Sequence, residues 1–206
     1  FIKYVIDGVL STHTAALVDP YTDRPDVIGE PFYIQNELNF LVKRANSYGM
    51  PVAIHAIGDR GVQMALNAFE YSNHLDLANR VEHVEVIQPG TVERFRELKV
   101  TASMQPNHGT GVIGKYITPR IGEEREQFAY VWNDFLKGRV RLELSSSFAT
   151  SPFSTLVQLF DAVFTENPSD LYDVACYPNQ RIRLDDAHAA YPPLVDDLTG
   201  RREQRG

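Results

Sequence analysis

Residues 51–61 read PVAIHAIGDRG, and the next apolar run, residues 80–86, reads RVEHVEV. Each is a short apolar run that reaches a histidine. Between them Val62, Ala65, Leu66 and Phe69 recur at the spacing of one helical face. A strand, a helix and a second strand in this order predict a βα unit, and repeated βα units predict a parallel sheet.

The same pattern extends in both directions along the chain. Apolar runs predict strands at residues 2–6, 51–55, 80–84, 100–105 and 140–144. Helical spacing predicts helices at residues 33–48, 61–71, 91–98, 124–136, 153–164 and 185–190. The strands are expected to be buried on both faces, as parallel strands usually are.

This order of elements predicts an α/β fold, for which two architectures remain open. One is an incomplete (β/α)8 TIM barrel formed by residues 1–195, and the other is an open doubly wound sheet. A barrel places its chemistry at the carboxyl ends of the strands, whereas an open sheet binds ligands at a switch point. Residues 196–206 are polar and are expected to form a frayed tail.

Composition narrows the range of partners. The 206 residues hold 20 Lys and Arg against 27 Asp and Glu, a net charge of -7, so we expect no nucleic acid partner. No apolar run approaches the roughly 20 residues of a membrane span, so we expect no membrane partner. Cys176 is the one cysteine, which suggests a reducing, cytoplasmic location.

Two histidines, His55 and His83, end consecutive predicted strands and can converge on a divalent metal ion. Neutral imidazole suits Zn²⁺ well. The alternative is that each is a hydrogen-bonded core histidine, and in an open sheet the two side chains would point apart. Lys3 is a third candidate, because a buried lysine is costly unless it is paired or chemically altered. It can take up carbon dioxide and become an anionic ligand, or extend from the strand end to solvent.

Other polar residues near the strand ends give weaker indications of a functional role. Asp59 can cap the following helix and Arg60 can pair with a carboxylate. Glu82 and Glu85 can orient His83 or face solvent. His108 follows the fourth strand and can reach a substrate, although loop histidines are more often exposed. The sequence contains no P-loop, G-x-G-x-x-G, H-E-x-x-H or paired C-x-x-C motif, and its Ser145-Ser146-Ser147 run is no nucleophile elbow.

The ordered motifs IKYVIDG, VAIHAIGDRGVQMALNAFE, RVEHVEVIQP and VTASMQPNH carry a family resemblance. Together they resemble the amidohydrolase superfamily, and most of all its branch that contains N-substituted formamide deformylase. The resemblance implies a (β/α)8 barrel with a small β-sandwich. It also implies hydrolysis of non-peptide C–N bonds of small-molecule amides by metal-activated water.

Position by position, the resemblance assigns roles to four residues. Lys3 matches the carboxylated lysine of the fourth barrel strand, and His55 and His83 match the metal-binding histidines of the fifth and sixth. Ser147 stands where relatives have the Asp of G-S-D-x-P-V, which is both a metal ligand and the general base. A neutral hydroxyl does not accept a proton at pH 7, and loss of a general base costs about 10²- to 10⁴-fold in rate.

The resemblance also implies a missing part. The family's H-x-H metal pair belongs to the first barrel strand, and these 206 residues contain no H-x-H. We therefore expect either a metal-dependent amidohydrolase, complete only within a longer protein, or a non-catalytic relative that binds a small molecule or a partner. Open strand edges at residues 2–6 and 140–144 predict a homodimer.

Overall fold

The computed structural model describes residues 1–110, 114–147, 154–166 and 177–191. The predicted tail, residues 196–206, lies outside this part of the chain. Five strands form one parallel sheet: β1 (Ile2–Val5), β2 (Val52–Ala56), β3 (Arg80–His83), β4 (Thr101–Met104) and β5 (Leu142–Leu144). All five strand predictions are confirmed, with bounds that shift by one or two residues.

The strand order decides between the two predicted architectures. Each strand pairs with the strand that precedes it and the one that follows it in sequence, from β1 to β5. A doubly wound sheet reverses its direction at a switch point, and this sheet does not. The fold is therefore part of a (β/α)8 barrel, and the open-sheet alternative is wrong.

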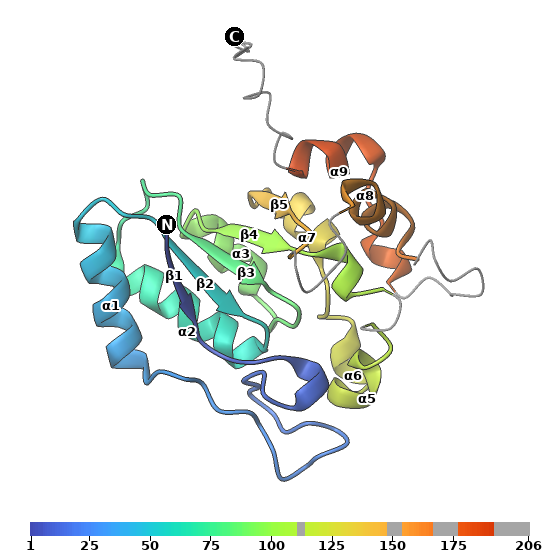
Figure 1. Cartoon of the computed structure of the whole chain (residues 1–206), viewed down its shortest axis with the longest axis horizontal. Coiled ribbons are helices and arrows are strands. Elements are labelled where there is room, and N and C mark those ends of the chain that lie inside the picture. The colour runs from blue at the N-terminus through green and yellow to red at the C-terminus, as the bar shows by residue number, and fades with distance from the viewer. Residues whose placement is uncertain (111–113, 148–153, 167–176, 192–206) are drawn as a thin grey trace.

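Helices cover the back of the sheet in Figure 1, where α2 (Asp59–Ser72), α3 (Thr91–Glu97) and α7 (Trp132–Lys137) lie behind the strands. Helix α1 (Gln35–Ser47) packs beside α2. Helices α8 (Thr155–Phe164) and α9 (Leu184–Ala190) follow β5. The core between helices and sheet is apolar, with Val62, Leu66 and Phe69 of α2 almost fully buried.

The helix predicted at residues 124–136 is wrong. The chain forms α6 (Glu123–Glu126) and α7, separated by a non-helical segment in which Tyr130 has a left-handed backbone with φ of 51°. Backbone bonds to the segment after β3 replace the helical ones, because Tyr130 N donates to Glu85 O at 2.9 Å and Ile87 N donates to Phe128 O at 3.0 Å.

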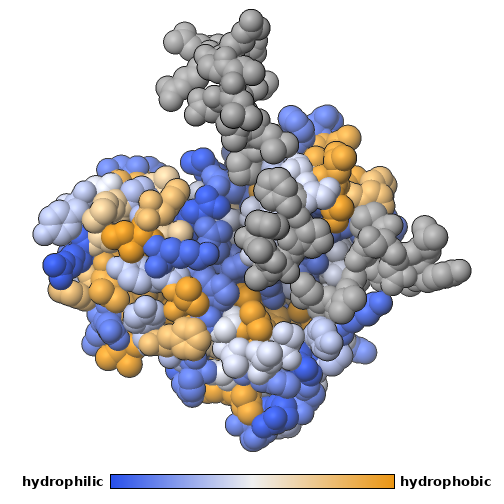
Figure 2. Space-filling view, viewed as in Figure 1, coloured by the Kyte–Doolittle hydropathy of each residue, from blue (hydrophilic) through white to orange (hydrophobic). Residues whose placement is uncertain are grey.

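The open face of the sheet is polar along its middle strands. The Nη1 of Arg80 lies 2.5 Å from Glu143 Oε2, and its Nε lies 2.6 Å from Glu82 Oε1. Figure 2 shows strongly hydrophilic side chains across the middle of this face. Paired charges tolerate partial burial better than single ones, so the network suits a partly enclosed interior.

Because all strands run in the same direction, their carboxyl ends meet at one edge. Beyond this edge lie η1 (Leu10–Thr12), η2 (Pro106–His108) and α5 (Ile117–Ile121), which sequence periodicity did not predict, while the short η3 (Pro178–Gln180) lies beside α7. Within the described residues, no helix is both long and apolar enough to cross a membrane.

Candidate metal centre

His55 and His83 meet at the carboxyl edge of the sheet. His55 lies near the end of β2 and His83 is the last residue of β3. Their ring centroids are 4.5 Å apart in an edge-to-face arrangement. The arrangement in which the two side chains point apart is therefore wrong.

The backbone at the end of β3 turns His83 toward the cavity. In register, Glu82 lies beside His55, so strict strand alternation would send the next side chain to the opposite face. His83 has φ of 78° and Val84 has φ of 51°, two consecutive left-handed residues. This conformation is rare for non-glycine residues, above all for a β-branched one, and it clusters at functional sites.

Each imidazole is oriented through one ring nitrogen. The Nε2 of His55 donates to Gly8 O at 3.1 Å, and the Nδ1 of His83 donates to Gln105 Oε1 at 2.7 Å. The Nε2 of Gln105 donates to Ser145 Oγ, which fixes the amide. The other nitrogen of each ring is left as a lone-pair donor, which is the usual arrangement of metal-binding histidines. Gln105, rather than Glu82 or Glu85, accepts from His83.

Glu85 and His108 complete the cluster. The Nδ1 of His108 lies 3.0 Å from Glu85 Oε1, and its ring stacks on His83 at 5.6 Å. Ligand atoms of His83, Glu85 and His108 all lie within 4.8 Å of one another. Both residues are buried, so His108 is not the exposed loop histidine that was the alternative to a residue within reach of a substrate. The sequence signal was present in the SMQPNH motif, but spacing alone did not show that η2 folds back over the strand end.

Burial keeps the histidines neutral. Burial, together with the neighbouring His55 and His108, lowers the pKa of His83 to about 3, and burial also lowers the pKa of His55. Metal binding requires the neutral imidazole, so the two rings need no deprotonation near pH 7.

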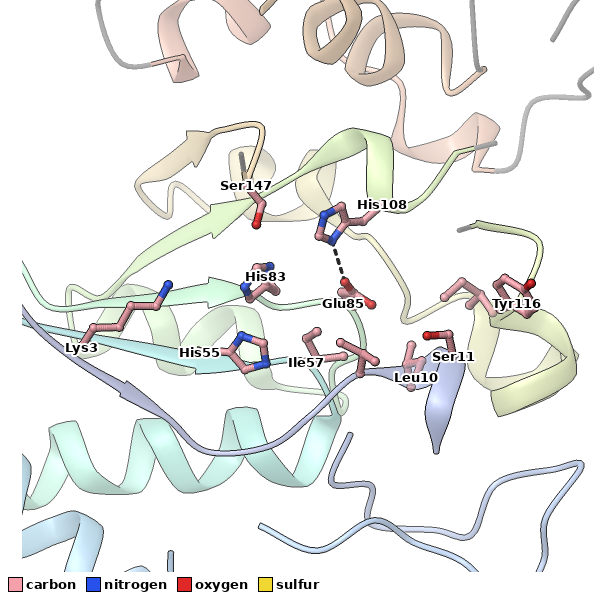
Figure 3. Close-up of a pocket in the computed structure, with 12 residues that line it drawn as sticks. Lys3, Leu10, Ser11, His55, Ile57, His83, Glu85, His108, Tyr116 and Ser147 are labelled. Carbon is pink, nitrogen blue, oxygen red and sulfur yellow. Dashed lines mark hydrogen bonds and ion pairs between the residues drawn. The ribbon is translucent and has the colours of Figure 1, made fainter. Parts of the chain in front are cut away.

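Lys3 and Ser147 line the same cavity from opposite sides. In Figure 3 the Lys3 side chain reaches toward the two histidines, and Ser147 lies above them. Among the described residues Lys3 makes no hydrogen bond or ion pair, and it is exposed, which fits the alternative of a lysine that extends from the strand end to solvent. Ser147 follows β5 in a left-handed conformation with φ of 53°.

Asp7 is a buried carboxyl that the sequence analysis missed. It accepts hydrogen bonds from the backbone N–H of Ile57 at 3.0 Å and of Gly58 and Ala16 at 2.9 Å. Its Oδ1 lies 3.6 Å from the Nε2 of His55, and burial raises its pKa to about 7. Asp7 thus ties the ends of β1 and β2 together beneath the site.

The GDRG motif follows this anchor. A Cβ at Gly61 would lie 2.8 Å from Asp7 Oδ2, so the position needs glycine. Asp59 accepts a hydrogen bond from the Val18 N–H at 2.9 Å and thereby holds a loop. Gly58, and not Asp59 as the sequence predicted, occupies the N-cap position of α2. Arg60 approaches Glu30 to 3.9 Å, an exposed pairing of little energetic weight.

These side chains surround a cavity of about 390 Å³. Its polar end is formed by Lys3, His55, His83, Glu85, His108 and Ser147. Nitrogen and carboxylate donors at the carboxyl ends of parallel strands match the position of chemistry in (β/α)8 barrels. The model of the amidohydrolase family matches residues 1–206.

The chain belongs to the amidohydrolase family. Protein LONG AFTER FAR-RED 3 of Arabidopsis thaliana is 30% identical over 191 residues, which cover 90% of this chain and 32% of that protein. N-substituted formamide deformylase of Arthrobacter pascens is 24% identical over 183 residues, covering 87% of this chain and 33% of that enzyme.

A solved structure supports the same assignment. An uncharacterized metal-dependent hydrolase from Pyrococcus furiosus matches with a TM-score of 0.79 and 33% identity, over 92% of this amidohydrolase chain and 37% of that chain. The chain therefore spans about a third of the length of these relatives. Of these relatives, the Pyrococcus furiosus protein is named as a metal-dependent hydrolase.

Proposed function

We propose that this chain contributes the metal-binding half of an amidohydrolase site that cleaves the C–N bond of a small amide or formamide. The observation that carries the proposal is the convergence of His55, His83, Glu85 and His108 at the carboxyl edge of the sheet. The name of the formamide deformylase relative supports the choice of bond.

The donor set fits a divalent ion, with Zn²⁺ as the first choice. His55 and His83 would hold it through the ring nitrogens that their hydrogen bonds leave free, and Lys3, once carboxylated, would add an anionic oxygen. When bound, the metal supplies a water of lowered pKa and polarises the scissile carbonyl.

The remaining polar residues would handle protons. Glu85 and His108 form a buried carboxylate–imidazole pair at 3.0 Å, next to His83. In such a pair Glu85 would orient the His108 ring through Nδ1, and the other ring nitrogen could pass a proton to the leaving amine. The hydroxyl of Ser147 can donate a hydrogen bond to the substrate but cannot take a proton at neutral pH.

Metal content tests the proposal. The chain is purified without an affinity tag, and bound metal is measured by plasma mass spectrometry in the parent, His55→Ala and His83→Ala proteins. We expect about one Zn²⁺ in the parent and none in either variant, whereas His188→Ala, an exposed position on α9, should keep the metal. A parent free of metal after zinc reconstitution would reject the proposal.

A second candidate function is binding without catalysis. The observation that favours it is Ser147, a hydroxyl at the position where the resemblance places the catalytic carboxylate. It would be preferred if the chain binds zinc and amides but hydrolyses none of a panel of formamides and cyclic amides.

We also propose a homodimer that forms through the open strand edges. Within the described residues β1 pairs only with β2, and β5 pairs only with β4, so each offers unpaired backbone groups. Size-exclusion chromatography with light scattering should give about twice 23.3 kDa, and a stable monomer would contradict this assembly. A cytoplasmic location belongs to the same proposal, since Cys176 has no second cysteine in the sequence to pair with.

A further inference from the structure

The end of the cavity away from β1 is apolar. We call Val9, Leu10, Ile57, Tyr116 and Ile117 the apolar wall. Figure 3 shows Leu10, Ile57 and Tyr116 across the cavity from Lys3. Leu10, Ile57 and Ile117 are nearly fully buried, while Val9 and Tyr116 are partly exposed, as expected for side chains at a mouth.

The wall joins two elements that lie about a hundred residues apart in sequence. Arg120 on α5 donates to Ser11 O at 3.0 Å and pairs with Asp23, and Thr22 N donates to Arg120 O at 2.8 Å. Arg125 donates to Pro20 O at 2.8 Å. The bond from Arg120 to Ser11 joins α5 to η1, and the others tie α5 and α6 to the loop that follows η1. The wall is therefore preformed and needs no closure to exist.

The wall carries no charge. Among the described residues that line this end of the cavity, Ser11 and Tyr116 contribute hydroxyl groups and the other side chains are apolar. Arg120 is committed to Asp23 and Ser11. A charge placed against the wall would lose hydration and meet no group of opposite charge there, which costs far more than burying an apolar group.

We propose that the apolar wall selects neutral amides that carry one compact apolar substituent, a ring or a branched alkyl group. This inference rests on the proposed function, because it places the amide group at the histidines and the substituent against the wall. A dry cavity of about 150 Å³ can hold a benzene molecule. The cavity of about 390 Å³ therefore has room for a six-membered ring and an amide.

The test compares two probes that differ by one charge. N-cyclohexylformamide and 4-formamidocyclohexanecarboxylate are titrated into the chain by calorimetry in EDTA, so that binding is measured without turnover. We expect the neutral probe to bind at least about tenfold more tightly, because only the carboxylate must be desolvated at the wall. Equal affinities, or tighter binding of the carboxylate through Lys3, would overturn the inference.

Matched variants locate the effect. Val9→Asp places a charge in the wall and should weaken binding of the neutral probe about tenfold. Val18→Asp, at a comparably exposed valine outside the cavity, should change it less than twofold. Tyr116→Ala and Tyr48→Ala form a second pair, in which only the first should weaken binding. Circular dichroism confirms that each variant folds, and equal effects within a pair would reject the wall as the site.

The proposed amide hydrolysis and the proposed selectivity of the apolar wall can be rejected independently. If the neutral probe binds as expected but no amide is hydrolysed after zinc loading, the wall stands and the proposed amidohydrolase activity is rejected. If amides are hydrolysed with equal kcat/KM for the neutral and charged probes, the activity stands and the wall is rejected as a selector.

Discussion

The Nδ1 of His83 and the Oε1 of Gln105 are joined by a hydrogen bond of 2.7 Å that links the end of β3 to the residue after β4. It fixes both the tautomer and the direction of the His83 ring, because the amide is itself held by Ser145. The orientation of the His83 ring is thus set by a residue that follows β4 rather than by β3, the strand that carries His83.

Replacing Gln105 by leucine should weaken zinc binding about 10- to 100-fold, the usual effect of losing a partner that orients a ligand. The variant keeps the side-chain volume but removes the acceptor for His83. Zinc affinity is measured by competition with a chromogenic chelator. Gln127→Leu, at an exposed position after α6, serves as the control, and an unchanged affinity in both variants would show that the hydrogen bond does not orient a ligand.

Asp7→Ala should destabilise the fold by about 3–5 kcal/mol, because it leaves the buried N–H groups of Ile57, Gly58 and Ala16 without an acceptor. Urea unfolding measures the change. Asp26→Ala removes a fully exposed carboxylate and should leave the midpoint unchanged. A variant as stable as the parent would mean that the three N–H groups find other partners.

The contrast between Asp7 and His55 shows what the sequence alone could predict. Parallel strands place their carboxyl ends at one edge, so the position of His55 followed from its place in an apolar run. The role of Asp7 depends on its contacts with Ile57 and Gly58, some fifty positions away, and on Ala16 folding back over the edge, none of which has a periodic signal. The pairing of His108 with Glu85 could not be predicted for the same reason, because it joins two loops that lie 23 positions apart in sequence.

The pH dependence of the free energy of unfolding should report the lowered pKa of His83. Burial lowers this pKa from 6.5 to about 3, so the contribution of neutral His83 to stability is complete above pH 6.5 and is lost as the pH falls toward 3. Asp7 acts in the opposite sense, since its pKa rises from 3.8 to about 7 and its contribution is lost as the pH rises through 7. Between about pH 4 and 6.5 the two slopes, each about 1.4 kcal/mol per pH unit, largely cancel.

His83→Asn should remove one of these two opposing slopes and leave the slope due to Asp7. Asparagine does not titrate and tolerates the left-handed backbone at this position. As the pH rises from 4 to 6.5, the free energy of unfolding of the variant should fall relative to that of the parent by about 1.4 kcal/mol per pH unit. Urea unfolding in EDTA at several pH values measures the difference, and a difference independent of pH would show that His83 titrates normally in the folded chain.

Ser147→Asp should raise any metal-dependent hydrolysis by about 10²- to 10⁴-fold, the range attributed to a general base. The position faces the cavity, and aspartate accepts its left-handed backbone with φ of 53° more readily than most residues. Ser147→Asn is the matched control, because it has nearly the same shape and backbone tolerance but cannot take a proton. Both variants are assayed with N-cyclohexylformamide after zinc loading. A gain in the aspartate variant alone would identify the missing carboxylate as the limit on catalysis, whereas equal rates in both would place that limit in residues outside this edge of the sheet.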